Sequence, residues 1–280
     1  MASPNPYLSG IGGTAGSPLA LVAPLLASGS VWYVKASTGS DAATPRGKER
    51  IRPLATLAQA ITNASAGDVI VLLEGHTESL SAAQTIATTG LLILGEGSGA
   101  SRPHFTRTGD VNMFDITAAG VELNNIYFNG STTTVSTKSR VRFAGVNSRV
   151  VGCYFDCAAT YDTGPALEFV TGASQVCVKG TYFVSTSTDV TTQPESAIKV
   201  TNAVTDFQLG GEASAEAVVF DGGSSGWSNP YAFNGAAAIT RFRGINVDLL
   251  HDSDMTFATG SSYVLHVRNT SGSARTVLTA

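Results

Sequence analysis

Four charged residues recur at nearly equal distances along the chain, and they are the first candidates for chemistry. Asp115, Arg142, Glu168 and Lys199 are separated by 27, 26 and 31 residues. Each stands between apolar neighbours, so in a strand each would point away from the core. Two carboxylates about 5 to 10 Å apart could serve as the acid and base of a glycoside hydrolase. Several carboxylates with a basic residue nearby could instead hold Ca²⁺ for a lyase.

The alternating sign of these four residues favours a structural role. Stacked at the strand spacing of about 4.8 Å, each carboxylate would have a cation as its neighbour. Such neighbours keep carboxylates ionised, whereas a general acid needs a raised pKa. We interpret the row as a structural charge ladder, and a catalytic pair or a subunit contact are the alternatives.

The other polar clusters offer weaker candidates. A second row, Asn129, Asp156, Val184 and Asp221, together with Asp162, is typical of corners, where Asp and Asn bond nearby backbone NH groups. The segment 251–254, which reads His-Asp-Ser-Asp, has no second histidine at ligand spacing. No partner is recognisable for the remaining histidines, which are His76, His104 and His266. The sequence therefore predicts no metal, no cofactor and no catalytic residue.

An internal repeat indicates which elements carry these residues. The pair Tyr127-Phe128 returns as Tyr154-Phe155 and Tyr182-Phe183, at spacings of 27 and 28 residues. Each repeat holds several short apolar segments separated by polar corners, which is typical of strands too short to bury their own faces. Leucine-rich repeats have a similar period but need Leu and Asn at fixed places that are missing here. We predict an all-β parallel solenoid whose stacked tyrosines and phenylalanines form a core aromatic ladder.

The segments at both ends of the repeats predict caps. Leu54, Leu57, Ala58 and Ile61 share one face of a short helix over about 54–62, which would shield the first coil's edge. At the other end, Tyr263 to Val267 and Thr276 to Thr279 predict an antiparallel hairpin. We divide the chain into an arm (1–30), a solenoid (31–223) and a C-terminal cap and trimer-contact region (224–280).

The first 30 residues predict an extended assembly arm. They are rich in Gly, Ala, Ser and Pro, and the first lysine is Lys35. No positively charged region precedes the apolar stretch, which Pro24 interrupts, so we expect neither a secretory signal nor a membrane span. Exposed apolar side chains often mark contact sites. The arm residues expected to dock on a subunit or larger assembly are Pro18, Leu19, Leu21, Val22, Leu25 and Leu26.

Composition narrows the class of partner. The chain has 280 residues, only 14% of them charged, and a net charge of −4. Its basic residues look scattered, so the sequence lacks the basic footprint of a nucleic-acid binder. Three cysteines without metal spacing, Cys153, Cys157 and Cys177, are expected to be small, buried and reduced.

The segment ahead of the repeats resembles a known superfamily. The residues that carry the likeness are Tyr33-Val34, Gly39-Ser40-Asp41, Pro53-Leu54, Thr56-Leu57, Ala60-Ile61 and Gly67-Asp68-Val69-Ile70. They are similar to the entry into right-handed parallel β-helices of the pectate-lyase-like superfamily. Within it, the chain most resembles bacteriophage tailspikes and the tailspike-like proteins that decorate capsids, which are typically homotrimers. The superfamily's polygalacturonase signatures are missing from the sequence.

This resemblance implies a function that the residues alone do not. We expect a non-enzymatic virion structural protein: a trimeric capsid decoration, or cement, protein on the capsid exterior that holds the major capsid protein shell through its arm. The alternative is a tailspike that binds host surface polysaccharide, with or without cleaving it. A secreted bacterial polysaccharide lyase is a third class, disfavoured by the missing signal.

Overall fold

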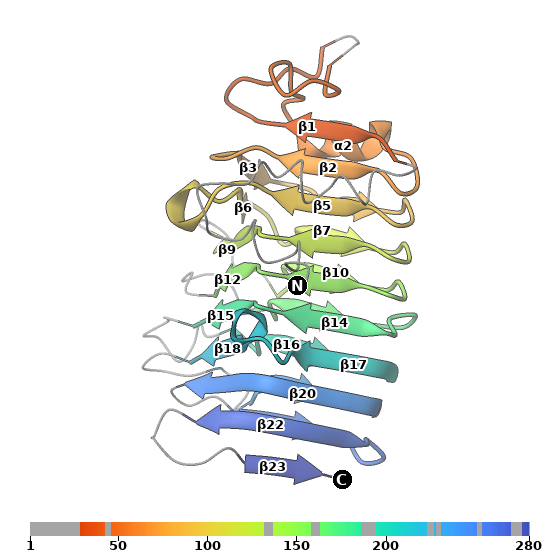
Figure 1. Cartoon of the computed structure of the whole chain (residues 1–280), viewed down its shortest axis with the longest axis vertical. Helices are drawn as coiled ribbons and strands as arrows, with labels where there is room; N and C mark the ends of the chain where they lie inside the picture. The colour runs from red at the N-terminus through yellow and green to blue at the C-terminus, as the bar shows by residue number, and fades with distance from the viewer. Residues whose placement is uncertain are drawn as a thin grey trace, which may run out of the picture.

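The chain winds into a parallel β-helix that stands as a rod, with β1 near one end and β23 at the other (Figure 1). The structure is a computed structural model. It describes residues 29–42, 46–131, 137–157, 163–185, 194–222, 227, 231–250, 254–269 and 276–279. The predicted assembly arm, from Pro18 to Leu26, lies outside the described residues.

Two sheets form the wall of the rod. Sheet B pairs one strand from each coil in parallel: β4 (Gln84–Ile86), β7 (Phe114–Ile116), β10 (Val141–Phe143), β13 (Leu167–Phe169), β16 (Ile198–Val200), β19 (Tyr231–Gly235) and β21 (Asp254–Phe257). Sheet A contains two parallel ladders. The first runs through β1 (Val31–Val34), β2 (Val69–Leu72), β5 (Leu92–Gly95), β8 (Glu122–Asn124), β11 (Arg149–Val151), β14 (Val176–Lys179) and β17 (Val204–Gly210). The second runs through β3 (Thr77–Leu80), β6 (His104–Arg107), β9 (Tyr127–Ser131), β12 (Tyr154–Asp156), β15 (Tyr182–Val184) and β18 (Val218–Asp221).

The two ladders of sheet A join at β20 (Ile239–Leu250), a strand of 12 residues that pairs with both β17 and β18. Beyond it, β22 (Tyr263–Asn269) is again parallel to β20, and β23 (Thr276–Thr279) is antiparallel to β22. The solenoid therefore continues past residue 223, where the sequence predicts its end. The short-strand repeat is lost there because one long strand replaces two.

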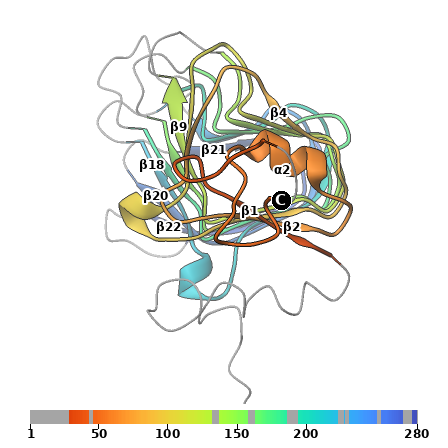
Figure 2. The same ribbon diagram turned by 90° about the horizontal axis from the view of Figure 1, so that it is seen from above.

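Helix α2 (Leu57–Asn63) lies across the β1 end of the rod (Figure 2). The Thr56 hydroxyl caps its first turn by accepting a hydrogen bond from the Gln59 N–H at 3.2 Å. Leu57 and Ala60 are buried against the first coil. The predicted helix is thus present at the predicted end. Two short 3₁₀ turns, Gly99–Ser101 and Ser214–Glu216, complete the described helices, none of which has the length and apolar character to cross a membrane.

Stacked phenylalanines fill the core. The rings of Phe128, Phe155 and Phe183 lie 4.9 and 5.0 Å apart, nearly parallel, and all three are fully buried. The tyrosines predicted to join them, Tyr127, Tyr154 and Tyr182, are also aligned in register, but they are half-buried on the outer face. Successive side chains of a strand point to opposite faces, so a Tyr-Phe pair cannot place both rings inside. Only the phenylalanine half of the predicted core ladder is correct.

Seven successive coils, from that of β2 to that of β20, share a left-handed residue just before or within the sheet A strand. Seven residues aligned by the strand register adopt φ from +54° to +81°: Gly67, Gly90, Gly120, Asn147, Gln175, Asp206 and Arg241. This conformation costs little for Gly and Asn but is strained for longer side chains. The later coils therefore retain the corner even where the residue type does not favour it.

Candidate functional site

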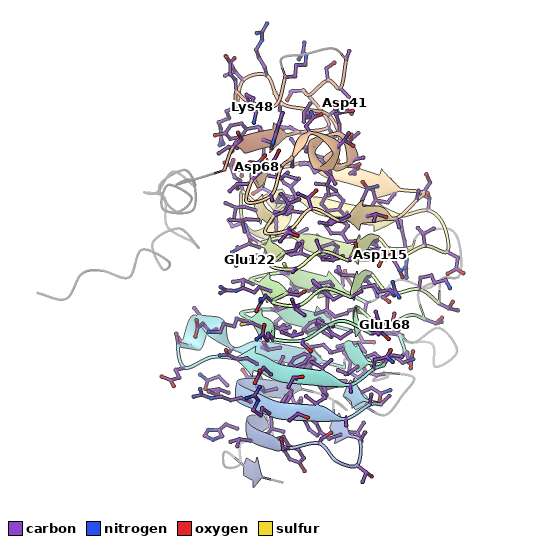
Figure 3. All side chains as sticks on the ribbon, turned by 90° about the vertical axis from the view of Figure 1, so that its right-hand side faces the viewer. Asp41, Lys48, Asp68, Asp115, Glu122 and Glu168 are labelled. Carbon is purple, nitrogen blue, oxygen red and sulfur yellow. The ribbon has the colours of Figure 1, made fainter. Side chains whose placement is uncertain are left out.

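The outer face of sheet B carries the charged row that the sequence singles out. The strand register places Asp115 beside Arg142, Arg142 beside Glu168, and Glu168 beside Lys199. Their apolar neighbours on each strand are buried, so all four side chains point outward. Asp115 and Glu168 lie on the same side of the rod in Figure 3.

Each charged group of this row is already engaged. Arg142 Nη1 lies 3.0 Å from Asp115 Oδ1. Glu168 accepts hydrogen bonds from the hydroxyls of Ser139, at 2.6 Å, and Thr201, at 3.0 Å. Lys199 pairs at 2.6 Å with Glu195. The expected ladder of charge pairs is therefore changed at Lys199, because Glu195, just ahead of β16, supplies the carboxylate instead of Glu168.

The spacing of the two carboxylates also bears on chemistry. Asp115 and Glu168 are two strands apart, or about 10 Å at the ordinary strand spacing, with Arg142 between them. A water-activating pair of carboxylates needs clear space between its members. Here a guanidinium fills that space, so the arrangement fits a self-neutralising surface.

The second row anchors tyrosines on the outer face of sheet A. The Tyr127 hydroxyl donates to Asp156 at 2.8 Å, and the Tyr182 hydroxyl donates to Asp221 at 3.3 Å. Burial, with the neighbouring carboxylates adding to it, raises the pKa of both tyrosines above the usual range. The Gly130 N–H donates to Asn129 Oδ1 at 2.7 Å. The prediction that this row lies at corners is wrong, because Asn129, Asp156 and Asp221 belong to β9, β12 and β18. The two aspartates bind side chains of the sheet, and Asp162 lies outside the described residues.

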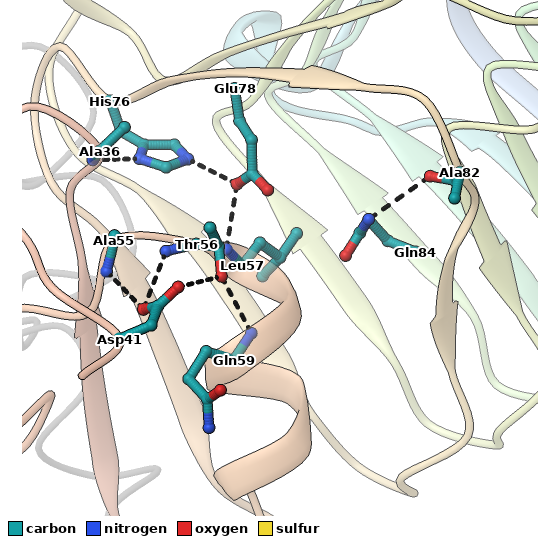
Figure 4. A network of polar contacts seen from close by, with 10 residues as sticks. All are labelled: Ala36, Asp41, Ala55, Thr56, Leu57, Gln59, His76, Glu78, Ala82 and Gln84. Carbon is teal, nitrogen blue, oxygen red and sulfur yellow. Dashed lines mark hydrogen bonds and ion pairs between the residues drawn. The ribbon is translucent and has the colours of Figure 1, made fainter. Parts of the chain in front are cut away.

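A buried network holds the β1 end of the rod (Figure 4). His76 is fully buried, and its Nδ1 accepts a hydrogen bond from the Ala36 N–H at 3.1 Å. Its Nε2 lies 3.3 Å from Glu78 Oε2, which also accepts from the Leu57 N–H at 3.0 Å. Because Nδ1 accepts, the proton of the neutral ring must be on Nε2, facing Glu78. His76 therefore has partners that the sequence did not reveal.

Asp41 completes this network from the loop after β1. It accepts hydrogen bonds from the Ala55 N–H at 2.8 Å and from the Thr56 hydroxyl at 2.7 Å. Thr56 is the residue that caps α2. This cluster has the residue types of a catalytic His-carboxylate site. Its polar groups, however, bind the capping helix to the first coil, which is a structural role.

The remaining histidines and the acidic groups form no metal site in the described part of the chain. His104 stacks on Tyr127 with ring centroids 4.5 Å apart, and burial lowers its pKa. Residues 251–253, and the Asp254 side chain with them, lie outside the description. Among the described residues, no group of three or more His, Cys, Asp and Glu side chains could hold a metal ion.

The three cysteines divide between core and surface. Cys153 and Cys157 are buried reduced thiols, and burial raises the pKa of the Cys153 thiol to about 12. Cys177 is also free but only half-buried, because it occupies an outward-facing position of β14. The prediction of three buried core cysteines is wrong for Cys177.

Sequence reasoning overlooked two features of the wall. Arg107 and Arg140 are fully buried, and they donate to the carbonyls of Val111, Ser139 and Asp156 between coils. A groove of about 690 Å³ also runs over β14, β17, β20 and β22; its side chains include Gln175, Gln208, Arg241, Arg243 and Val264. The arginines that line the groove pair with carboxylates: Arg241 with Asp206 at 2.6 Å, and Arg243 with Glu212 at 3.3 Å.

Comparisons with known proteins agree with the fold. No family model matches the sequence, and no curated protein does. A solved structure described as a rhamnogalacturonan lyase superposes with a TM-score of 0.51 at 14% identity, over 86% of this chain and 66% of that one. This chain thus spans less than two thirds of that structure's length. At this identity the likeness concerns the fold alone.

Proposed function

We propose that the chain is a non-enzymatic structural protein of a phage virion, a tailspike-like β-helix that decorates and stabilises the capsid. The observation that carries this proposal is that the charged side chains of the sheet B row are bound to other side chains of the same chain. On that face each charged group is occupied: Arg142 by Asp115, Glu168 by two hydroxyls, and Lys199 by Glu195. A surface that neutralises itself suits lateral packing better than acid–base catalysis.

The same proposal includes a homotrimer of right-handed solenoids. Crossovers between parallel strands are right-handed in about 98% of cases, which supports that winding. Three rods packed around a common axis would match a threefold position on an icosahedral shell. The arm residues, among them Leu21, Val22 and Leu25, would then bury apolar side chains on the major capsid protein.

Two measurements test this function. Light scattering on the purified chain is expected to give three times its 28.8 kDa mass. Electron microscopy of virions that lack the protein is expected to show bare or fragile heads. Intact heads that fail to adsorb to the host would contradict the decoration role and favour a spike.

The groove over β14, β17, β20 and β22 favours one second candidate, a spike that binds host polysaccharide. Its volume of about 690 Å³ is in the range of ligand sites, and its amide and guanidinium groups can bond sugar hydroxyls. The test is a glycan array with the wild-type chain and with Gln208→Ala. Glycan binding by the wild type that is lost in Gln208→Ala would support the spike. A screen for released oligosaccharides would show whether the chain cleaves the polysaccharide.

A further inference from the structure

A short basic loop projects from the β1 end of the rod. Residues 46–52, here called the tip loop, read Arg-Gly-Lys-Glu-Arg-Ile-Arg. Four of these seven residues are basic and one is acidic, whereas the whole chain carries −4. The impression from the sequence that basic residues are scattered is therefore wrong at this end. Lys48 marks the loop at the end of the rod in Figure 3.

The tip loop is held in one conformation by the coil beneath it. The Gly47 N–H donates to the Arg52 carbonyl at 2.8 Å, and the Tyr33 N–H donates to the Gly47 carbonyl at 2.7 Å. Lys48 Nζ lies 3.6 Å from the centre of the Trp32 ring. Arg50 forms an ion pair with Glu96, the residue that follows β5. These contacts order the loop before any partner arrives, which lowers the entropic cost of binding.

This ordered loop presents an apolar side chain to solvent. Ile51 is 87% exposed, about twice as exposed as Val146 and Val264, the other exposed large apolar residues among those described. Arg50 and Arg52 flank it. Within the described residues, neither Arg46 nor Arg52 forms an ion pair, and Arg52 is exposed while Arg46 is half-buried. An apolar anchor surrounded by cations fits the centre and rim of a protein interface.

We propose that the tip loop binds an acidic protein surface, with Ile51 entering an apolar depression and Arg46 and Arg52 pairing with carboxylates around it. The inference rests on the proposed function, under which that surface belongs to the capsid shell. The rod would then stand on its β1 end. Ser30, the last residue of the predicted arm, is held at this same end, because its N–H donates a hydrogen bond of 2.6 Å to Asp68.

The test measures binding of the purified full chain to capsids prepared without it, by co-sedimentation. Ile51→Ala and Arg52→Gln are each expected to weaken binding at least tenfold. Their controls remove an apolar and an arginine side chain away from the tip: Val146→Ala on the side of the rod and the exposed Arg149→Gln of β11, both expected to bind as wild type. Binding of the wild-type chain is also expected to weaken steeply with added salt, since exposed charge pairs are screened.

The possible outcomes separate the inference from the proposed function. If both tip variants bind capsids as tightly as the wild type, the tip loop is not the contact, and the decoration role is unaffected. A loss with Arg52→Gln alone would overturn Ile51 as an anchor. Failure of the wild-type chain to bind capsids would overturn the proposed function, and the inference with it. Melting curves check the fold of each variant, and removal of a side chain as exposed as Ile51 is expected to leave them unchanged.

Discussion

Asp68 shows how one carboxylate fixes the first coil. It accepts hydrogen bonds from the Ser30 N–H at 2.6 Å, the Ser65 N–H at 2.9 Å and the Trp32 indole at 2.9 Å. Burial alone would raise the pKa of Asp68, but these donors and nearby Lys48 outweigh it and lower the pKa. The ionised form is therefore the one that the folded chain favours.

This shift predicts a pH-dependent cost for Asp68→Asn. A carboxyl whose pKa is depressed by folding stabilises the protein above its unfolded pKa, near 3.9, and this contribution is lost as the pH falls through the folded value. We expect the variant to lose about 2 kcal/mol at pH 7 and progressively less below about pH 4. Urea unfolding at pH 7 and below about pH 4 measures the loss in unfolding free energy, with the exposed Glu49→Gln variant as the control. If the difference in unfolding free energy between the wild type and Asp68→Asn does not shrink in acid, the lowered pKa of Asp68 is wrong.

Glu168 separates the structural from the catalytic interpretation of the sheet B row. Glu168→Gln weakens the bonds from Ser139 and Thr201, so we expect a loss of about 1 kcal/mol and a fall in Tm of about 2–4 °C. Glu212→Gln is the control, because that side chain is 84% exposed and such pairs contribute little. An unchanged Tm together with lost hydrolysis of a polysaccharide would make Glu168 catalytic.

The capping helix protects strand edges that could otherwise recruit other chains. Ala60 of α2 is buried against the first coil, whereas Ala58 of the same helix is exposed. Ala60→Asp is expected to displace the helix and to produce end-to-end association, measured by light scattering, because open strand edges pair with one another. Ala58→Asp should leave the mass unchanged. Equal masses for the two variants would show that the end needs no cap.

The aromatic columns of β12 contribute unequally. Phe155 is fully buried in the phenylalanine stack, and its neighbour Tyr154 is half-buried outside. We expect Phe155→Ala to lower the free energy of unfolding by about 3–5 kcal/mol, and Tyr154→Ala to lower it by less than half of that, both measured by urea unfolding. Equal losses would place the stabilising column on the outer face instead.

The rod as a whole should open from its ends. Each middle coil is hydrogen-bonded to a coil on either side, whereas β1 and β23 each pair with one strand among those described. Amide hydrogen exchange is therefore expected to be slowest in β10 to β15 and fastest in β1, β22 and β23. Rapid exchange throughout the middle coils would contradict a cooperative solenoid.

The architecture was predictable from the sequence because it repeats, and local chemistry was less so. The returning Tyr-Phe pairs define the coil, and the apolar spacing of Leu57 and Ile61 defines the capping helix. The partners of His76 and Glu168 come from other segments, which no local pattern reveals. The tip loop was missed because four basic residues in seven look unremarkable until the fold brings them to one end.

The shared left-handed corner makes the coil a unit of growth. Since the corners at Gly120 and Asn147 align in register, a duplicated block of the 27 residues between them would meet the same geometry on both sides. Such an insertion would lengthen the rod by about 4.8 Å without disturbing either tip. The length of the rod is therefore set by the number of coils, and it can be changed in steps of one coil by duplicating or deleting whole coils.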